Sequence, residues 1–324
     1  MANPVIAEVT RGGIVESRHR GAYAIVDQSG RVVESEGDID APVFPRSAIK
    51  AFQCLPVIEQ GAADRFGFSD EDIALACSSH NGEAEHVRVA RAMLAKAGNT
   101  EDQYECGAHW PAEFHAHAEA IRAGTEPLAV HNNCSGKHAG MLALARGLGV
   151  PTDGYVKRDH PVQRAIASAM GKICGCDLDA APCGVDGCSV PTWAMPLRNV
   201  ALGFSRLCAP GHQAGGRIIA AVRAHPFMVA GSRSFDTLVM KDVPRVFAKR
   251  GAEGVHCGCI PHAGLGIAIK CDDGAGRAGE AAFASILSRL DGWTAEEAAA
   301  LRGRTSHDLR NWRKISVGAV RSVN

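Results

Sequence analysis

A serine and a lysine three residues apart, Ser47 and Lys50, form the pattern in this sequence that most directly suggests catalysis. Pro45 suits the beginning of a helix, because its missing N–H costs no helical hydrogen bond there. Ser47 and Lys50 would then share one face of the first turns of that helix. A lysine accepts a serine proton only when its pKa is lowered from about 10.4 toward neutrality. The spacing therefore predicts a serine nucleophile with a lysine base.

A second pair of the same kind, Ser79 with Lys270, is far apart in sequence. Ser79 follows the apolar run 73–75 and precedes a helical pattern at 84–97, and polar side chains at a strand-to-helix junction tend to line a cleft. Residues 264–274 have the pattern of a buried strand that ends in Lys270 and a turn. Two bland interpretations stay open, in which Ser79 caps the following helix and Lys270 is an exposed strand end.

The cysteines do not have the spacing of a structural zinc site. Cys134 and Cys188 are 54 residues apart and neither belongs to a C-x-x-C pair. Buried free cysteines are common in protein cores, so packing is an alternative role for both. Cys134 and Lys137 have a helical i, i+3 spacing, so a thiolate and an amine could share one face, provided that the lysine is neutral. His138, next along the chain, is expected on the helix surface, and the alternative is a role in supporting the metal ligands.

Seven segments spread along the chain resemble the L-asparaginase II family of bacterial proteins, the thermolabile, rhizobial-type class. The segments that carry this resemblance are Arg46-Ser47-Ala48-Ile49-Lys50, Ser78-Ser79-His80-Asn81-Gly82-Glu83, Cys106-Gly107-Ala108-His109-Trp110-Pro111, His131-Asn132-Asn133-Cys134-Ser135-Gly136-Lys137-His138, Gly184-Val185-Asp186-Gly187-Cys188-Ser189-Val190-Pro191, His225-Pro226-Phe227-Met228-Val229-Ala230-Gly231 and Lys270-Cys271-Asp272-Asp273-Gly274.

The resemblance implies a fold like that of serine β-lactamases and glutaminases, two Ser/Lys pairs, a zinc site and a homodimer. Matched to this sequence, the pairs are Ser47/Lys50 and Ser79/Lys270. The three implied zinc ligands are Cys134, Lys137 and Cys188, with one ion per chain. A site of thiolates and an amine suits holding substrate better than activating water, for which His-rich sets are commoner.

The implied reaction is hydrolysis of the side-chain amide of L-asparagine to aspartate and ammonia, with Ser47 as nucleophile and Lys50 as base. Ser79 and Lys270 would relay protons or hold the substrate. Asp186 is a candidate for binding the substrate's α-ammonium group, or it shapes its own turn, and His80 and Asn81 are further substrate-binding candidates. A glutaminase or a β-lactam hydrolase is the alternative enzyme, because one methylene is worth only ~1–3 kcal/mol of discrimination. A non-catalytic zinc- or amino-acid-binding protein is the alternative of another class.

Bulk properties predict a water-soluble protein. The 324 residues are 46% hydrophobic and only 5% aromatic, and 35 basic residues balance 35 acidic ones, so no charge field favours nucleic acid or a membrane. No apolar run reaches the ~18 residues of a membrane span. Residues 1–4 lack the pattern of an export signal, and twelve scattered cysteines fit a reduced compartment, so the sequence predicts a cytoplasmic location.

The elements that must position these residues follow a simple order. Strand patterns occur first, helical patterns dominate the middle of the chain, and strand patterns return at the end. This order predicts an α+β protein in which an antiparallel sheet from both termini is flanked by a helical region at approximately 47–224, within a single catalytic unit 1–324. The expected strands are 8–10, 13–16, 22–26, 31–34, 265–270 and 314–320, and the expected helices are 47–60, 84–97, 111–122, 135–148, 161–173, 215–224 and 277–290.

Overall fold

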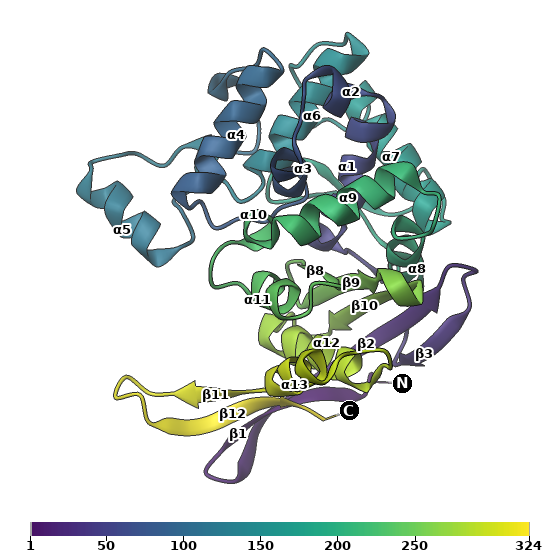
Figure 1. Cartoon of the computed structure of the whole chain (residues 1–324), viewed down its shortest axis with the longest axis vertical. Coiled ribbons are helices and arrows are strands. Elements are labelled where there is room, and N and C mark those ends of the chain that lie inside the picture. The colour runs from purple at the N-terminus through teal and green to yellow at the C-terminus, as the bar shows by residue number, and fades with distance from the viewer. Residues whose placement is uncertain (1, 324) are drawn as a thin grey trace. The chain divides into compact units, whose positions relative to one another are not determined.

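The computed structural model describes residues 2–323. Contacts between residues divide the chain into two compact units. The first, here called the sheet unit, comprises 1–48, 195–205 and 239–324, and the second, here called the helical unit, comprises 49–194 and 206–238. The chain passes from the sheet unit to the helical unit between Ala48 and Ile49. Figure 1 labels the helices and strands of both units.

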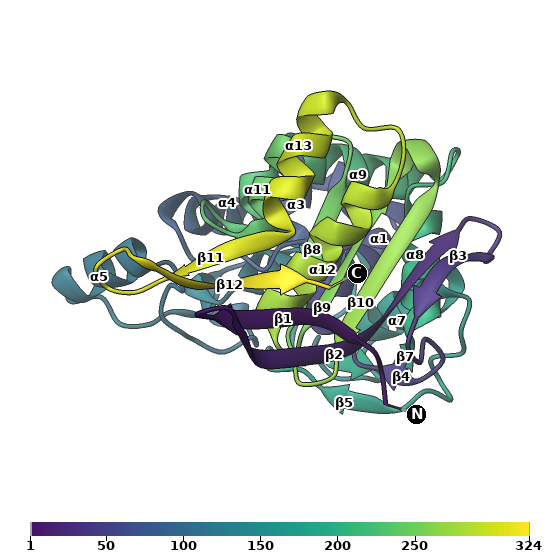
Figure 2. The same cartoon turned by 90° about the horizontal axis from the view of Figure 1, so that it is seen from below.

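The sheet unit contains one eight-stranded antiparallel sheet within the described residues, in the order β11-β12-β1-β2-β10-β9-β8, with β3 also paired to β2. Strands from the two ends of the chain therefore lie side by side in it (Figure 2). Its strands are β1 (Val5–Arg11), β2 (Ile14–Asp27), β3 (Val32–Glu36), β8 (Phe247–Arg250), β9 (Val255–Ile260), β10 (Leu265–Cys271), β11 (Ser306–Arg310) and β12 (Ser316–Ser322). Two short strands, β4 (Pro42–Val43) and β7 (Met195–Pro196), form a separate pair.

A single long strand, β2, joins the two halves of this sheet. Its first half pairs with β1 and its second half with β3 and β10. The side chains of β2 become continuously buried from Gly21 to Val26, as expected for a strand covered on both faces. Helix α12 (Gly276–Arg289) packs on β1, β9, β10 and β12 and buries its apolar face there.

The helical unit is built around α6 (Ser135–Leu148), which is buried over eleven consecutive residues and packs on α1, α2, α3, α4 and α7. Gly149 ends α6 in the left-handed conformation that glycine tolerates. The remaining helices of the chain are α1 (Lys50–Glu59), α2 (Ala62–Arg65), α3 (Asp70–Ala76), α4 (Ala84–Lys96), α5 (Phe114–Arg122), α7 (Pro161–Cys174), α8 (Leu197–Leu207), α9 (Gln213–Ala224), α10 (Pro226–Ala230), α11 (Phe235–Asp242) and α13 (Ala295–Arg304), with a hairpin of β5 (Cys183–Val185) and β6 (Pro191–Trp193).

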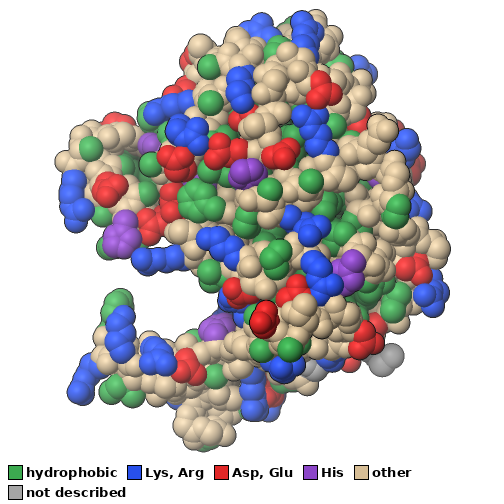
Figure 3. All heavy atoms as spheres, in the orientation of Figure 1, with side chains coloured by type: hydrophobic (Ala, Val, Ile, Leu, Met, Phe, Trp, Pro, Cys, Tyr) green, Lys and Arg blue, Asp and Glu red, His purple; other side chains and the backbone are tan. Residues whose placement is uncertain are grey.

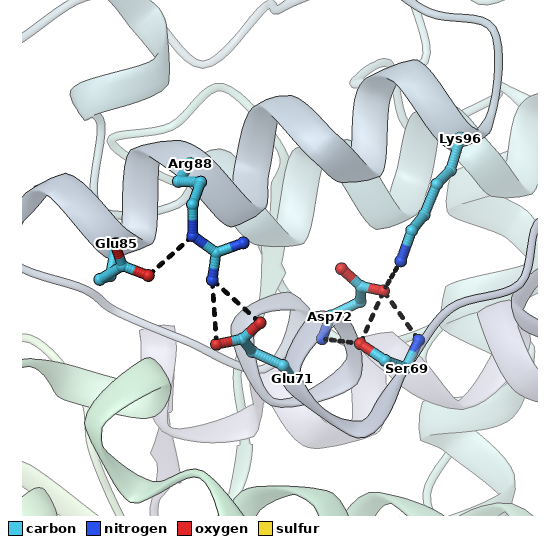
Figure 4. Close-up of polar contacts among 6 residues, drawn as sticks. All are labelled: Ser69, Glu71, Asp72, Glu85, Arg88 and Lys96. Atoms are coloured by element: carbon cyan, nitrogen blue, oxygen red, sulfur yellow. Dashed lines mark hydrogen bonds and ion pairs between the residues drawn. The ribbon is translucent and has the colours of Figure 1, made fainter.

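Charged side chains on α3 and α4 connect these two helices on their exposed side (Figure 4). Arg88 Nη2 lies 3.1 Å from Glu71 Oε2, and Lys96 pairs with the buried carboxylate of Asp72. Asp72 also accepts the backbone N–H of Ser69, whose hydroxyl caps the first turn of α3. These contacts fix the start of α3, whose other end leads into Ser78 and Ser79.

The predicted α+β fold class is confirmed by these elements. The helices expected at 135–148 and 161–173 match α6 and α7 closely, and those at 84–97 and 277–290 match α4 and α12. Two predictions are wrong. The apolar run 73–75 belongs to helix α3 rather than a strand, and the two strands expected between 13 and 26 are one continuous strand, β2. The helical region expected at approximately 47–224 overlaps most of the helical unit, which extends further, to 238.

All twelve cysteines are free thiols. Among residues 2–323, no helix is both long and apolar enough to cross a membrane. On the face drawn in Figure 3, basic and acidic side chains are interspersed, as expected from the balance of 35 against 35.

Candidate active site

Lys50 is the first residue of α1 and is completely buried. Its Nζ lies 2.9 Å from Ser79 Oγ, 2.5 Å from Ser78 O and 3.4 Å from Asn133 O. The structure therefore pairs Lys50 with Ser79, whereas the sequence pattern had paired Lys50 with Ser47 and Ser79 with Lys270. An amine held against a serine hydroxyl in a dry site is an arrangement that can exchange a proton.

Ser79 is held by its backbone as well as by Lys50. Its N–H donates to Val229 O at 2.9 Å, and its side chain is 6% exposed. The chain turns sharply after it at Gly82, which has a φ of 71°. A Cβ at Gly82 would lie 2.9 Å from Pro111 Cα, so only glycine fits the close approach of these two loops.

His80 is a structural histidine in this site. Its Nδ1 accepts the backbone N–H of Gly82 at 3.1 Å, so the proton is on Nε2, which donates to Ser135 Oγ at 2.8 Å. Burial, followed by the positive fields of His86 and Lys50, lowers the pKa of His80 well below its usual value. Both ring nitrogens therefore form hydrogen bonds within the protein. Neither is free to bind substrate in the role predicted for His80.

Asn81 is only partly buried. Its Nδ2 donates to Ser234 Oγ at 3.2 Å, and its backbone oxygen accepts the N–H groups of Ala112 and Glu113. The side-chain oxygen of Asn81 has no role in these contacts, and Asn81 stays a substrate-binding candidate.

The three residues proposed as metal ligands lie together in the helical unit. Lys137 Nζ is 2.9 Å from Cys188 Sγ, and the thiols of Cys188 and Cys134 are hydrogen-bonded to each other. That hydrogen bond, together with the charges of Lys50 and Lys137, lowers the pKa of Cys134 well below its usual value. The same hydrogen bond and burial raise the pKa of Cys188.

This donor set fits a thiophilic cation such as zinc, because two buried sulfurs and one amine lie close together. Burial disfavours the charged form of Lys137, but the neighbouring Cys134 and Cys188 raise the pKa of its amine, so metal binding must displace that proton. No group of three or more His, Cys, Asp and Glu side chains within 2–323 is placed to hold a metal ion.

Asp186 shapes the turn of the β5–β6 hairpin. Its Oδ1 accepts the N–H of Gly187 at 2.7 Å, and its backbone N–H donates to Val190 O. Ser189 has a φ of 74° in the same turn. The turn interpretation of Asp186 therefore has direct support, and its carboxylate also raises the pKa of Lys137, which links the turn to the thiol cluster.

Ser47 belongs to the sheet unit, in a short 3-10 helix, Arg46–Ile49, that leads directly into α1. Arg46 has a φ of 52°, a left-handed conformation that is uncommon for arginine and typical of functional sites. Ala48 N donates to Pro45 O and closes this turn. Ser47 is half-buried, so it is more accessible than the buried Ser79.

Lys270 also belongs to the sheet unit, and its Nζ donates to Glu253 O and Cys271 O. It is partly exposed, as expected for a strand end.

Sequence reasoning missed Lys249, which is completely buried on β8. The turn that carries Ser47 packs on Gly251, where a Cβ would lie 2.6 Å from Pro45 O. Lys249 is two residues before Gly251 in the sequence, so it lies close to this turn. The signal for it was a lysine directly after the apolar run 246–248.

Five of the ten predicted site residues therefore form one connected cluster in the helical unit. The contacts run from Ser79 to Lys50, to Cys134, to Cys188 and to Lys137. His80, Asn81 and Asp186 flank this cluster, and Ser47 and Lys270 lie in the sheet unit.

The chain combines an α+β fold with a buried hydrogen bond between Lys50 and Ser79. The L-asparaginase II family model matches residues 7–322, nearly the whole chain. The chain belongs to the L-asparaginase II family. No curated protein matches the chain significantly.

Solved structures with a similar arrangement are distant in sequence. Mglu in its native form, in the presence of 4.3 M NaCl, is 16% identical over 85% of this chain and 63% of that chain, with a TM-score of 0.46. The chain thus spans less than two thirds of that Mglu chain. A β-lactamase from Mycobacterium bovis is 15% identical over 88% of this chain and 95% of that chain, with a TM-score of 0.41.

Proposed function

We propose that this protein is an amidohydrolase and that it hydrolyses the side-chain amide of L-asparagine to aspartate and ammonia through a serine acyl-enzyme. The observation that carries the proposal is the buried hydrogen bond between Lys50 and Ser79. Lys50 is the first residue of α1, which follows the short 3-10 helix that contains Ser47. Family membership supports amide hydrolysis, and the Ser-x-x-Lys spacing supports acyl transfer.

Ser47 is the nucleophile in this proposal. Its hydroxyl is accessible, and the strained Arg46 before it shows that the surrounding structure constrains this turn. Lys50 accepts the serine proton and later returns one to the departing ammonia, while water resolves the acyl-enzyme. Ser79, in contact with Lys50, relays protons between the lysine and the reacting groups.

Cys134, Lys137 and Cys188 would hold one zinc ion, which supplies positive charge close to Lys50 when bound. Two sulfurs and an amine suit a metal that holds the structure in place. Cys188 lies two residues after Asp186, so the ion would fix the position of the Asp186 turn. Asp186 and Asn81 are then candidates for contacts to the amino-acid end of the substrate.

Ammonia release from L-asparagine, with and without Ser47, tests this proposal. Ser47→Ala should lose about 10⁴-fold or more of the wild-type rate, because a nucleophile has no substitute in acyl transfer. Ser79→Ala should lose less, because water can replace a relay hydroxyl. If Ser47→Ala keeps more than roughly a tenth of the rate, Ser47 is not the nucleophile.

Substrate choice needs a second assay. The same purified protein is compared with L-asparagine, L-glutamine and a chromogenic β-lactam, since one methylene changes binding by only ~1–3 kcal/mol. A kcat/KM for L-glutamine or the β-lactam above that for L-asparagine would favour the alternative enzyme. No turnover of any of the three would favour a binding protein.

A further inference from the structure

A cavity of about 370 Å³ in the helical unit is lined by α7, by the turn that follows α7 and by β6. The residues that line it are separate from the ten predicted site residues. Two of them, Leu178 and Trp193, are apolar and buried, whereas the others are mostly polar or charged. A volume of ~300–1,000 Å³ with apolar lining and a few convergent polar groups is typical of a small-molecule site.

One face of α7 brings basic side chains to this cavity. Arg164, Ser168 and Lys172 recur at every fourth residue, so they lie along one side of the helix, and all three line the cavity. Arg158, in the segment before α7, lines it as well and donates from Nη2 to Asp179 O at 3.2 Å. The side chains of Arg164 and Lys172 have no hydrogen-bond or ion-pair partner within 2–323. Two cations of the cavity are therefore free to bind a ligand.

The turn after α7 brings two carboxylates to the same cavity. Asp177 Oδ1 accepts the N–H groups of Asp179 at 2.9 Å and of Ala180 at 3.4 Å, which fixes the turn. Cys176 N also donates to Gly171 O at 3.0 Å and holds the turn against the end of α7. The carboxylate of Asp179 accepts no hydrogen bond from the described residues. The turn is therefore held by its own contacts, and the Asp179 carboxylate is left for a ligand.

Opposite charges share this cavity without pairing. Three cations and two carboxylates line it, and in the part of the chain that the structure describes no ion pair joins one of these cations to one of these carboxylates. Elsewhere on the protein neighbouring charges do pair, as Arg88 does with Glu71. A molecule with two carboxylates and one ammonium group offers partners to both signs and balances the excess of one positive charge. An inorganic anion such as phosphate would leave both carboxylates of the cavity unpaired.

We propose that this cavity binds an acidic amino acid, whose carboxylates pair with the three cations and whose ammonium group pairs with the carboxylates of the turn. The planar guanidinium of arginine binds a carboxylate through two parallel hydrogen bonds, which suits the arginines of this set. L-aspartate and L-glutamate share this chemistry, and the site does not depend on the proposed function. Only the status of L-aspartate as a product of this protein's own reaction rests on that function.

Binding of radiolabelled L-aspartate and L-glutamate to the full chain, measured by equilibrium dialysis, tests the proposal. Arg164→Gln and Lys172→Gln should each weaken one site by tenfold or more, because each removes a charged donor to a carboxylate. Both side chains are exposed and unpaired, so the thermal midpoint should stay unchanged. Arg122→Gln is the matched control, since Arg122 is also an exposed helical arginine, at the end of α5, and it should bind as the wild type does.

The ammonium contact has its own test. Succinate carries two carboxylates and no ammonium group, so it should compete for this site at least tenfold more weakly than L-aspartate. Asp179→Asn should weaken L-aspartate binding and leave succinate binding unchanged or stronger, because it removes a carboxylate that attracts the ammonium group and repels succinate. The backbone oxygen of Asp179 stays available to Arg158 in this variant.

The number of sites separates this proposal from the proposed function. If the proposed reaction is correct, the wild type has two sites for L-aspartate per chain, one of them the active site, and Arg164→Gln weakens one of the two. If the reaction is wrong, the wild type has one site and Arg164→Gln weakens that one. A wild type without binding of either amino acid beyond the active site, variants Arg164→Gln and Lys172→Gln with unchanged binding, or succinate that competes as strongly as L-aspartate would each overturn the proposal.

Discussion

At the scale of single residues, burial distinguishes the lysines of this protein. Lys50 and Lys249 are completely buried, whereas Lys270 is partly exposed, and all three amines donate to backbone carbonyls. A buried lysine costs free energy unless its environment compensates, so such residues concentrate at functional sites. Burial therefore favours Lys249 over Lys270 as the second lysine of the reaction.

Replacement of each lysine by methionine tests this choice. We expect Lys249→Met to lower kcat/KM for L-asparagine by about 10²-fold or more, the usual size of a lost proton-transfer group. Lys270→Met should stay within about threefold of wild type, because it removes only contacts to backbone at a strand end. The reverse order of the two effects would restore Lys270 to the proposed role.

The thiol cluster makes a separate prediction about metal. Purified protein should contain about one zinc ion per chain by elemental analysis, and Cys134→Ser and Cys188→Ser should each lose most of it, because two ligands hold a metal poorly. Cys106→Ser is the matched control, since Cys106 is equally buried but bonded to Ala129 O. Equal zinc in the double variant and in wild type would contradict the site.

At the scale of elements, close packing of helices positions the Lys50–Ser79 pair. Helix α6 crosses α3 so closely at Gly136 that a Cβ there would lie 2.4 Å from Leu75 O. Leu75 is near the end of α3, four residues before Ser79, and Gly136 lies between Cys134 and Lys137. One glycine contact therefore brings the serine segment and the thiol segment together.

Gly136→Ala should destabilise the protein by about 1–3 kcal/mol, because the close backbone contact outweighs the better helix propensity of alanine. Gly216→Ala is the matched control. Gly216 is an exposed helical glycine with nothing within 4 Å of a Cβ, and its substitution should stabilise by up to about 1 kcal/mol. The free energy of unfolding in denaturant measures both. A neutral Gly136→Ala would mean that the helices can separate without cost.

At the scale of the whole molecule, buried neutral histidines couple stability to pH. Burial lowers the pKa of His80, His86 and His138, all in the helical unit. The unfolded chain takes up these protons near pH 6.5, before the folded chain does. Their contribution to stability is therefore complete above about pH 6.5 and is lost as the pH falls below it.

Denaturant unfolding from pH 7.5 to 5 should show a falling free energy, with up to about 1.4 kcal/mol per pH unit from each histidine. His138→Gln should flatten this slope by up to that amount, because Tyr155 O–H can donate to the new amide instead. His115→Gln, at an exposed position, should leave the slope unchanged. An unaltered slope in His138→Gln would show that this histidine titrates normally.

The sequence by itself determined the elements with strong local patterns. The apolar periodicity of α6 and α7 predicted their bounds closely, and the order of strands and helices predicted a sheet from both termini. Family motifs brought together Cys134, Lys137 and Cys188, which the structure places in contact. These features depend on residues close in sequence or on an order along the chain, so a linear reading captures them.

Only the tertiary structure decided which side chains meet. Lys50 lies against Ser79, 29 residues away, because α1 and α3 both pack on α6. His138 is buried rather than on the helix surface, because α6 is covered on all sides. The burial of Lys249 depends on the segments that pack around β8, and local periodicity carries no information about them. Hydrophobic burial and close packing between distant segments set these contacts, so they follow from the assembled fold alone.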